Sequence, residues 1–448
     1  MKRWKKFLVA ATVFLTGCSM ANLVSAADII AQKIISDAIK DVTGIAEVYG
    51  DGEKVTAAIL KYPEKIDPKG ISTSDFHVEG KTIEAVFVND DSTLPNKSKA
   101  GRYVILKFTN ENTSFDGELS QKPSGQKPRK SQGQNQDGKG DAPMRSDRKL
   151  PDLSFSVEQV NQIKSSKGAI FLPTNQAIEC SKIKAPIIES FKQLVYTDLN
   201  GVSMPYNLYL PENYKSGKKY PLLFFVADAS ANINEVTTPL FQGNGATVFA
   251  DPKWQKKHEC IVLAPQYTAD LVEELGMMTT DENVWTPGLT LVSELLFDVI
   301  DNYSVDKKRI YGTGQSQGGM TNIAISDKYP NLFAAQYLVA CQWNVDEMEA
   351  IKDKNLWITV CEGDTKAFPE MNSVVKRWKS LDSKVARNVD FWDSKASVKD
   401  LNKQVKDMIK KNANINYTVF QGGNHMYTWS FAYNIDAIRE WLFSKKNK

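Results

Sequence analysis

Hydrophobic and polar residues alternate along the first part of the chain. The alternation is regular over residues 54–62, 82–88 and 102–108, and clusters of Gly, Asp, Asn and Pro separate these segments. A period of two puts the apolar side chains on one face of a strand, and short strands divided by turn residues are typical of a sandwich. The pattern therefore predicts a small all-β, immunoglobulin-like sandwich at about residues 43–177.

Residues 121–149 interrupt this pattern. They are mainly Lys, Gln, Gly, Ser, Pro and Asp, which bury too little apolar surface to offset the entropy lost on ordering. We therefore expect a disordered basic insertion. Residues 153–160 alternate again, which favours an insertion within the sandwich; a linker between domains is the alternative.

From Phe191 onward, continuous apolar runs replace the alternation. Such runs are typical of parallel strands buried on both faces. They occur at residues 221–227, 261–264, 309–311, 335–340, 356–360 and 417–420. Apolar residues at helical spacing lie between them, for example Val292, Leu295, Leu296 and Val299. Residues 191–448 are therefore predicted to form a doubly wound α/β sheet, with an opening hairpin at Asn200-Gly201.

The first 26 residues resemble a targeting signal. Basic residues at positions 2–6 precede an apolar run at 7–15, which ends in Leu15-Thr16-Gly17-Cys18. This ending looks like a bacterial lipobox, which implies cleavage before Cys18 and lipidation of its thiol. A soluble secretory signal cut after Val24-Ser25-Ala26 is the alternative. Either reading predicts an extracytoplasmic protein, and the first predicts a lipid anchor in a bacterial membrane.

Composition narrows the classes of function. The 448 residues suffice for two domains, and a net charge of +3 does not argue for nucleic-acid binding. No spacing of Cys and His resembles a zinc site. An oxidising compartment permits disulfides, but the pairing of Cys180, Cys260, Cys341 and Cys361 stays open.

The segment Gly314-Gln315-Ser316-Gln317-Gly318 is the first candidate for chemistry. It follows a predicted strand and precedes a helical pattern, the context that a nucleophile elbow requires. The sharp turn puts the serine in a strained backbone conformation, and the flanking glycines avoid Cβ clashes there. A Gly-x-Ser-x-Gly pattern alone also occurs by chance, so the rest of a catalytic site must be found elsewhere.

The chain has only three histidines to act as a base. His77 lies in the predicted sandwich, and His258 precedes a strand and so belongs at the opposite edge of the sheet. His425 follows the last strand, at the edge that carries Ser316. We therefore predict His425 as the general base.

A carboxylate between Ser316 and His425 should complete the site. Asp364 follows the strand at 356–360 and would accept the Nδ1 proton of His425. Glu362 is the competitor, but it stands nearer the strand and should point aside. The resulting order Ser, Asp, His is that of the α/β-hydrolases.

An oxyanion hole needs two N–H donors. We expect one from the backbone amide of Gln317 and the other from the loop after the strand at 221–227, from Asp228 or Ala229. Trp285, Trp343 and Trp429 fall in loops at the same predicted edge, so they are weaker candidates for lining a substrate pocket.

Residues 191–448 resemble secreted esterases or predicted peptidases of the α/β-hydrolase superfamily, related to prolyl-oligopeptidase-like and polyhydroxybutyrate-depolymerase-like esterases. Those proteins often carry an N-terminal immunoglobulin-like domain. The resemblance rests on residues 206–214, 220–225, 261–266, 306–311, 314–319, 329–335 and 423–429. It implies hydrolysis of carboxylic esters by Ser316, Asp364 and His425, without a cofactor or metal. Peptidase activity on short peptides and a catalytically silent binding lipoprotein are the alternatives.

The chain departs from this family at one place. The family usually has His-Gly after the strand at 221–226, where this chain has Ala227 and Asp228. A carboxylate near a developing oxyanion is repulsive unless it turns away or pairs with a cation. Asp228 could instead hydrogen-bond its own loop, and we favour this interpretation over reduced activity.

Overall fold

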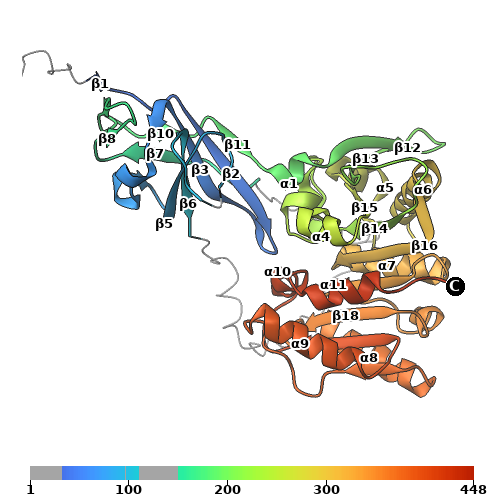
Figure 1. The fold of residues 1–448 in the computed structure, drawn as a ribbon. Coiled ribbons are helices and arrows are strands. Elements are labelled where there is room, and N and C mark those ends of the chain that lie inside the picture. The colour runs from blue at the N-terminus through green and yellow to red at the C-terminus, as the bar shows by residue number, and fades with distance from the viewer. Residues whose placement is uncertain (1–32, 96, 110–149) are drawn as a thin grey trace, which may run out of the picture.

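The computed structural model describes residues 33–95, 97–109 and 150–448, which form two domains joined side by side (Figure 1). The predicted signal at 1–26, its Cys18 and the predicted insertion at 121–149 lie outside the described residues. No helix in the described part of the chain is long and apolar enough to cross a membrane.

The first domain is a β-sandwich. Its largest sheet has the order β11-β2-β3-β6-β5, the opposing sheet has the order β10-β7-β4, and β1-β9-β8 form a small third sheet. The strands are β1 Ile34–Ile35, β2 Asp41–Tyr49, β3 Gly52–Ile66, β4 Phe76–Val78, β5 Ile83–Asn89, β6 Gly101–Phe108, β7 Ser156–Gln159, β8 Ile163–Lys164, β9 Ile170–Phe171, β10 Ile178–Glu179 and β11 Lys182–Lys184. Alternate residues such as Leu60, Val104 and Val157 fill the core between the sheets.

The sandwich continues after residue 149. Strand β7 pairs with β4, which precedes the gap, and β11 pairs in parallel with β2. The segment outside the description is therefore flanked by strands of one domain, as an insertion requires. The sandwich also extends past residues 43–177 at both ends, because β1 pairs with β9 and β11 with β2.

The second domain is a nine-stranded sheet of order β12-β13-β15-β14-β16-β17-β18-β20-β19. From β15 onward the neighbouring strands run parallel, and the antiparallel pair β12 and β13 opens the sheet. The strands are β12 Lys192–Thr197, β13 Ser203–Tyr209, β14 Tyr220–Val226, β15 Ile261–Pro265, β16 Val305–Gln315, β17 Ala335–Val339, β18 Leu356–Cys361, β19 Val385–Arg387 and β20 Ile415–Phe420. The predicted doubly wound α/β sheet is confirmed.

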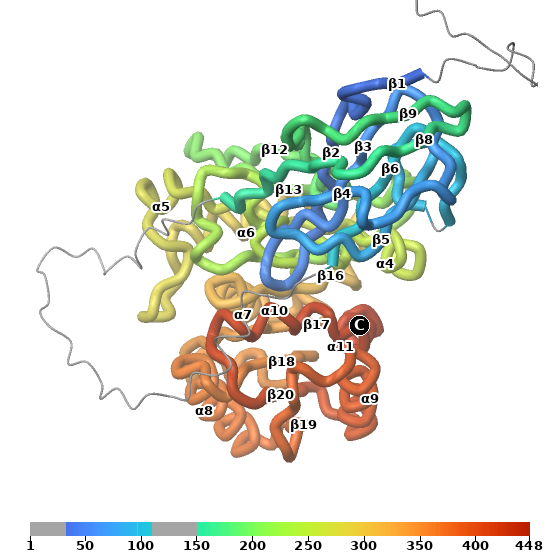
Figure 2. Tube along the Cα trace, turned by 90° about the vertical axis from the view of Figure 1, so that its left-hand side faces the viewer, coloured from blue at the N-terminus to red at the C-terminus, as the bar shows by residue number. Residues whose placement is uncertain are grey.

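Helices cover both faces of this sheet (Figures 1 and 2). Within β14, Leu222 and Phe224 pack with α5 to α8 on one face, and Leu223 and Phe225 pack with α3, α4, α9 and α11 on the other. The helices are α1 Pro186–Glu189, α2 Thr238–Phe241, α3 Thr247–Ala250, α4 Pro252–Lys257, α5 Ala269–Leu275, α6 Pro287–Asn302, α7 Gln317–Lys328, α8 Ala367–Ser380, α9 Val398–Ile409, α10 Tyr427–Ala432 and α11 Asp436–Phe443. Burial on both faces explains why the strands are continuously apolar.

The turn between β2 and β3 joins the two domains. It reaches α10, so closely that a Cβ on Gly50 would lie 2.0 Å from the Ser430 carbonyl oxygen. On its other side, the ideal Cβ of Gly243 would lie 3.1 Å from the Gly50 carbonyl oxygen. Only glycine fits at position 50, because any side chain would collide with backbone.

All four cysteines of the described chain are free thiols. Cys260, Cys341 and Cys361 are buried in the second domain, and Cys180 is half-buried in the first. Burial raises the pKa of Cys260 and of Cys361 to about 12. Their thiols therefore stay protonated and act as small apolar groups in the core.

Candidate active site

Ser316 stands at the turn between strand β16 and helix α7, at the carboxyl end of the central strand. Its φ of 51° and ψ of −122° are strained for a residue with a side chain. This is the backbone conformation that the glycine-flanked motif predicts. A Cβ on Gly318 would lie 1.8 Å from the Val226 carbonyl oxygen, so the turn can pack against the end of β14 only with glycine there.

A continuous hydrogen-bonded chain links the three predicted residues. His425 Nε2 lies 2.8 Å from Ser316 Oγ, and His425 Nδ1 lies 2.6 Å from Asp364 Oδ2. An ionised carboxylate can only accept, so the proton on His425 belongs on Nδ1, and Nε2 is left to accept from the serine hydroxyl. This tautomer is the one that a general base for Ser316 requires.

Asp364 is held in a fixed orientation after strand β18. Its Oδ1 accepts hydrogen bonds from the backbone amides of Lys366, at 3.0 Å, and Ala367, at 2.9 Å. Burial raises the pKa of Asp364, since the residue is 1% exposed. The hydrogen bond and charge of His425, together with the hydrogen bonds from the two amides, outweigh burial, so the pKa is lowered overall. Asp364 is therefore ionised near neutral pH.

Glu362 does not compete for His425. Its Oε2 accepts a hydrogen bond from the Gly422 amide at 3.2 Å. The carboxylate is therefore turned to the backbone of the histidine loop, whereas Asp364 reaches the ring itself. The structure thus brings Asp364 to the position expected from the sequence.

His258 and His77 lie away from Ser316. His258 follows α4 and its Nε2 lies 2.8 Å from Glu440 Oε2, on α11. His77 lies on β4 of the sandwich. The placement of His258 agrees with its elimination by strand direction, and that of His77 agrees with its assignment to the sandwich.

Asp228 hydrogen-bonds the loop beside Ser316. Its Oδ1 accepts from the Ser230 amide at 2.7 Å and caps a short 3-10 helix, Ala229–Ala231. The Ala231 amide donates to the Asp228 carbonyl oxygen. The Ala229 amide is therefore the donor that the first turn of this helix leaves without an internal partner.

The other oxygen of Asp228 faces amide side chains. Gln242 Nε2 donates to Oδ2, and Gln315 Nε2 lies 3.5 Å from it. Asp228 is 5% exposed, and neither Gln242 nor Gln315 is more than 3% exposed. The carboxylate thus turns into a buried amide network. Gln242 comes from the turn after α2, and no local motif in the sequence could have indicated its role.

Of the three candidate tryptophans, Trp429 lies beside the hydrogen-bonded chain. Its ring meets that of His425 edge to face, with centroids 5.4 Å apart at 88°. Trp429 is 4% exposed on α10, so it supports the ring and offers little surface to a substrate.

Trp285 and Trp343 lie beside the second half of α7. With Asp327 and Lys328 they line a cavity of about 370 Å³. Lys328 Nζ lies 3.8 Å from the Trp285 ring centroid, and Trp343 Nε1 donates to Glu347 at 2.7 Å. Because α7 begins next to Ser316 and rises about 1.5 Å per residue, the structure does not bring these two tryptophans to Ser316.

Asp327, in this same cavity, makes a testable contribution to stability. Neither of its buried oxygens has a hydrogen-bond partner among the described residues, and burial followed by repulsion from Glu347 raises its pKa to about 8. In the unfolded chain the group ionises near its ordinary value of about 3.9. Between about pH 4 and pH 8 the unfolded state therefore releases a proton that the folded state keeps, so stability falls as pH rises.

Asp327→Asn should remove this loss. A pKa shift corresponds to about 1.4 kcal/mol per unit, and we halve it because water screens the charge at this half-buried residue. The variant should therefore gain about 3 kcal/mol in unfolding free energy over wild type at pH 8 and much less at pH 4. Urea unfolding at both pH values measures the difference. Asp346→Asn, at an exposed neighbouring position, serves as the control. An equal effect of Asp327→Asn at both pH values would contradict the assignment.

Comparison with known proteins agrees with both domains. Residues 41–172 match the family described as esterase Ig-like N-terminal domain. A thermostable esterase of known structure is 24% identical, with a TM-score of 0.69, and the match covers 91% of this chain and 100% of that one. A feruloyl esterase module from Clostridium thermocellum is 17% identical over 55% of this chain and 86% of its own, with a TM-score of 0.39.

The family match and the likeness to the thermostable esterase define the fold. The chain is an α/β-hydrolase-fold protein with an immunoglobulin-like N-terminal domain. A search of curated protein sequences finds no match. Within the residues that the structure describes, no group of three or more His, Cys, Asp or Glu side chains could hold a metal ion.

Proposed function

We propose that this protein is a serine hydrolase that cleaves carboxylic esters through an acyl-enzyme on Ser316. The hydrogen-bonded chain Ser316, His425 and Asp364 carries the proposal, because it joins a nucleophile, a base and an orienting carboxylate in the required order. The strained backbone of Ser316 and the overall likeness to the fold of a thermostable esterase support it.

In the proposed reaction, Ser316 Oγ attacks the ester carbonyl while His425 Nε2 takes the serine proton. Asp364 accepts the Nδ1 hydrogen bond and stabilises the resulting imidazolium. His425 then donates the proton to the departing alcohol, which leaves an acyl-enzyme. Water enters, loses a proton to His425 and attacks the acyl carbonyl, so that the acid is released and Ser316 recovers its proton.

The backbone amides of Gln317 and Ala229 are the proposed oxyanion donors. Gln317 is the first residue of α7, so its amide has no acceptor within the helix. The Ala229 amide stands at the equivalent position of the 3-10 helix across from it. The loop of Ala229 adjoins the turn, since the ideal Cβ of Gly318 would lie 2.8 Å from the Ala227 carbonyl oxygen. Asp228 positions this second donor.

Labelling with a fluorophosphonate tests the nucleophile directly. The probe should form one covalent adduct on Ser316, located by peptide mass spectrometry, and short p-nitrophenyl esters should be hydrolysed. Matched anilides of the same acids test for peptidase activity and should turn over far more slowly. Absence of both labelling and turnover in folded protein would favour the silent binding protein instead.

Asp228 variants separate its capping role from its charge. Asp228→Ala removes the cap and one of the two acceptors of the buried Gln242 amide, the other being Ser230 Oγ, which should cost about 2–4 kcal/mol of unfolding free energy and lower kcat. Asp228→Asn keeps an oxygen for the Ser230 amide and removes a negative charge near the oxyanion, so its kcat should equal or exceed that of wild type. If both variants lose kcat equally, the carboxylate acts by charge and not by capping.

We further propose that the protein is exported and anchored to a bacterial membrane through a lipid on Cys18. The sequence Leu15-Thr16-Gly17-Cys18 at the end of an apolar run supports this location. Metabolic labelling with a fatty acid should mark wild type and not Cys18→Ser. Release of unlabelled wild-type protein cut after Ala26 would instead establish a soluble secreted form.

A further inference from the structure

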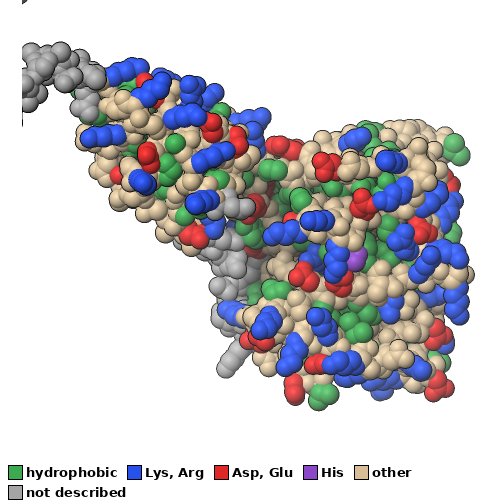
Figure 3. Space-filling view, viewed as in Figure 1, with side chains coloured by type: hydrophobic (Ala, Val, Ile, Leu, Met, Phe, Trp, Pro, Cys, Tyr) green, Lys and Arg blue, Asp and Glu red, His purple; other side chains and the backbone are tan. Residues whose placement is uncertain are grey.

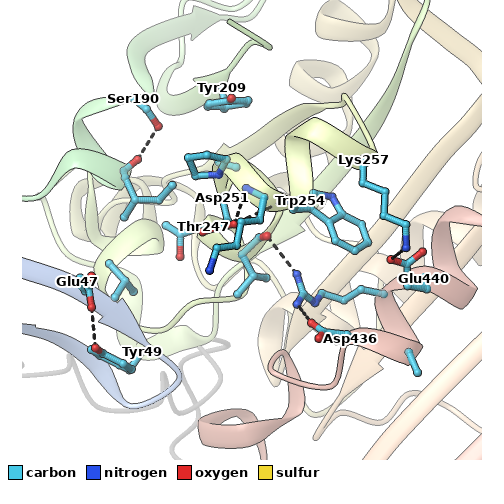
Figure 4. A pocket seen from close by; sticks show the side chains of 18 of the residues that line it. Glu47, Tyr49, Ser190, Tyr209, Thr247, Asp251, Trp254, Lys257, Asp436 and Glu440 are labelled. Atoms are coloured by element: carbon cyan, nitrogen blue, oxygen red, sulfur yellow. Dashed lines mark hydrogen bonds and ion pairs between the residues drawn. The ribbon is translucent and has the colours of Figure 1, made fainter. Parts of the chain in front are cut away.

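A large cleft separates the sandwich from the back of the α/β domain (Figures 3 and 4). Its volume is about 1250 Å³. Strand β2 and helix α1 form one wall, and helices α3, α4, α9 and α11 form the other. Ser316, Asp364 and His425 are not among its lining residues. The cleft is therefore a second site, distinct from the proposed active site.

The floor of the cleft is apolar. Trp254 and Trp441 line it and are each less than 10% exposed. Tyr49 and Tyr209 stand on the walls (Figure 4). Aliphatic residues complete the surface, namely Ile45, Ala46, Val48, Pro186, Ile187, Val248, Ala250, Ile409 and Ala437. A cleft between domains with such a lining is suited to the apolar body of a ligand.

The carboxylates around the cleft are all engaged. Glu440 pairs with Lys257 at 2.5 Å, and Asp436 pairs with Arg439. Asp251 Oδ1 caps α4 by accepting from the Lys253 amide at 2.8 Å, and Glu47 accepts from the Tyr49 hydroxyl at 2.7 Å. Basic partners therefore neutralise Glu440 and Asp436, whereas Glu47 and Asp251 are held by neutral hydrogen-bond donors and keep their negative charge.

Three lysines of the lining are not engaged in this way. Within the described chain, Lys253 on α4, Lys406 on α9 and Lys445 after α11 have no carboxylate at ion-pair distance. Lys445 Nζ instead lies 5.1 Å from the Trp441 ring centroid, and burial lowers its pKa. A negative group brought to this rim would compensate these charges without displacing an existing ion pair.

We propose that the interdomain cleft binds a long-chain carboxylate, with its chain on the apolar floor and its anionic head at one or more of the rim lysines Lys253, Lys406 and Lys445. The apolar lining favours this amphiphile over a polyanion, which would find three free cations but no polar floor. The proposal is independent of the reaction proposed at Ser316, because no residue of that site is needed for it.

Isothermal titration of the full-length protein with dodecanoate, below its micelle concentration, tests the proposal. Saturable binding of dodecanoate is expected. Three comparison ligands should bind more weakly: dodecanol lacks the charge, dodecyltrimethylammonium has the opposite charge, and butyrate lacks the long chain. Lys253→Glu/Lys406→Glu should weaken dodecanoate binding tenfold or more. Lys256→Glu/Lys403→Glu is the matched control, with the same charge change on the same two helices outside the cleft.

Val248→Trp supplies a second variant, which fills the cleft without changing its charge and should also abolish binding. Circular dichroism checks that each variant is folded. The proposal is overturned if dodecanoate does not bind, if the cationic analogue binds equally well, or if both lysine pairs have the same effect. Dodecanoate bound at the Ser316 site would be insensitive to all these variants, and that result also overturns it.

Discussion

Replacing Ser316 by alanine should lower kcat for a short p-nitrophenyl ester by about 10⁴-fold or more, because the residues of the proposed triad should act as a unit and the proposed nucleophile has no substitute. The loss should fall on kcat and leave the thermal midpoint near that of wild type. Serine and alanine both carry a Cβ, so alanine removes the hydroxyl without adding contacts or changing the strain of the positive φ at this position.

The double variant Ser316→Ala/His425→Ala sharpens this test. If the two side chains work through the 2.8 Å hydrogen bond, the double variant should be no slower than Ser316→Ala alone. Ser373→Ala, at an exposed position on α8, is the control and should retain full activity. Turnover by Ser316→Ala above a tenth of wild type would contradict the assignment of the nucleophile.

Gly318→Ala is expected to have the second large effect, on the fold of the site itself. The new Cβ would lie 1.8 Å from the Val226 carbonyl oxygen and 2.4 Å from its carbon, both backbone atoms at the end of a central strand. Neither can move without disturbing β14 or α7. We expect a loss of about 3 kcal/mol or more in unfolding free energy, together with loss of ester hydrolysis and of labelling by a fluorophosphonate.

Gly217→Ala gives the comparison for this substitution. Gly217 lies in the loop before β14, and its ideal Cβ would have no neighbour within 4 Å. The variant should be as stable as wild type or slightly more stable, since alanine restricts the unfolded chain. Similar denaturation midpoints for Gly318→Ala and Gly217→Ala would show that β14 yields to the extra methyl group.

The site was predictable where its chemistry is local in the sequence. Ser316 lies in a five-residue motif, and a parallel sheet sets the strand ends at which Asp364 and His425 must stand. His258 could be set aside on the same ground, because it precedes its strand. The strands of a parallel sheet all point the same way, so a residue that follows a strand lies at the carboxyl edge and one that precedes it lies at the opposite edge. These placements therefore needed no knowledge of tertiary contacts.

Contacts between distant segments were not predictable in this way. Gln242 reaches Asp228 from a separate turn, and nothing near either residue in the sequence indicates the pair. Trp285 and Trp343 follow elements at the expected positions, but the paths of their loops carry them beside the second half of α7. Strand β19 was also missed, because three residues are too few to form a recognisable pattern.

The hairpin turn of the sandwich has a consequence for how the protein opens. Gly50 packs closely against the backbone of Ser430 on α10. The residue before Ser430, Trp429, contacts the ring of His425. Undocking of the sandwich and local opening of α10 are therefore linked equilibria, in which each event favours the other. The two domains should melt in one calorimetric transition, and amide hydrogens of α10 should exchange as slowly as those of the turn that holds it.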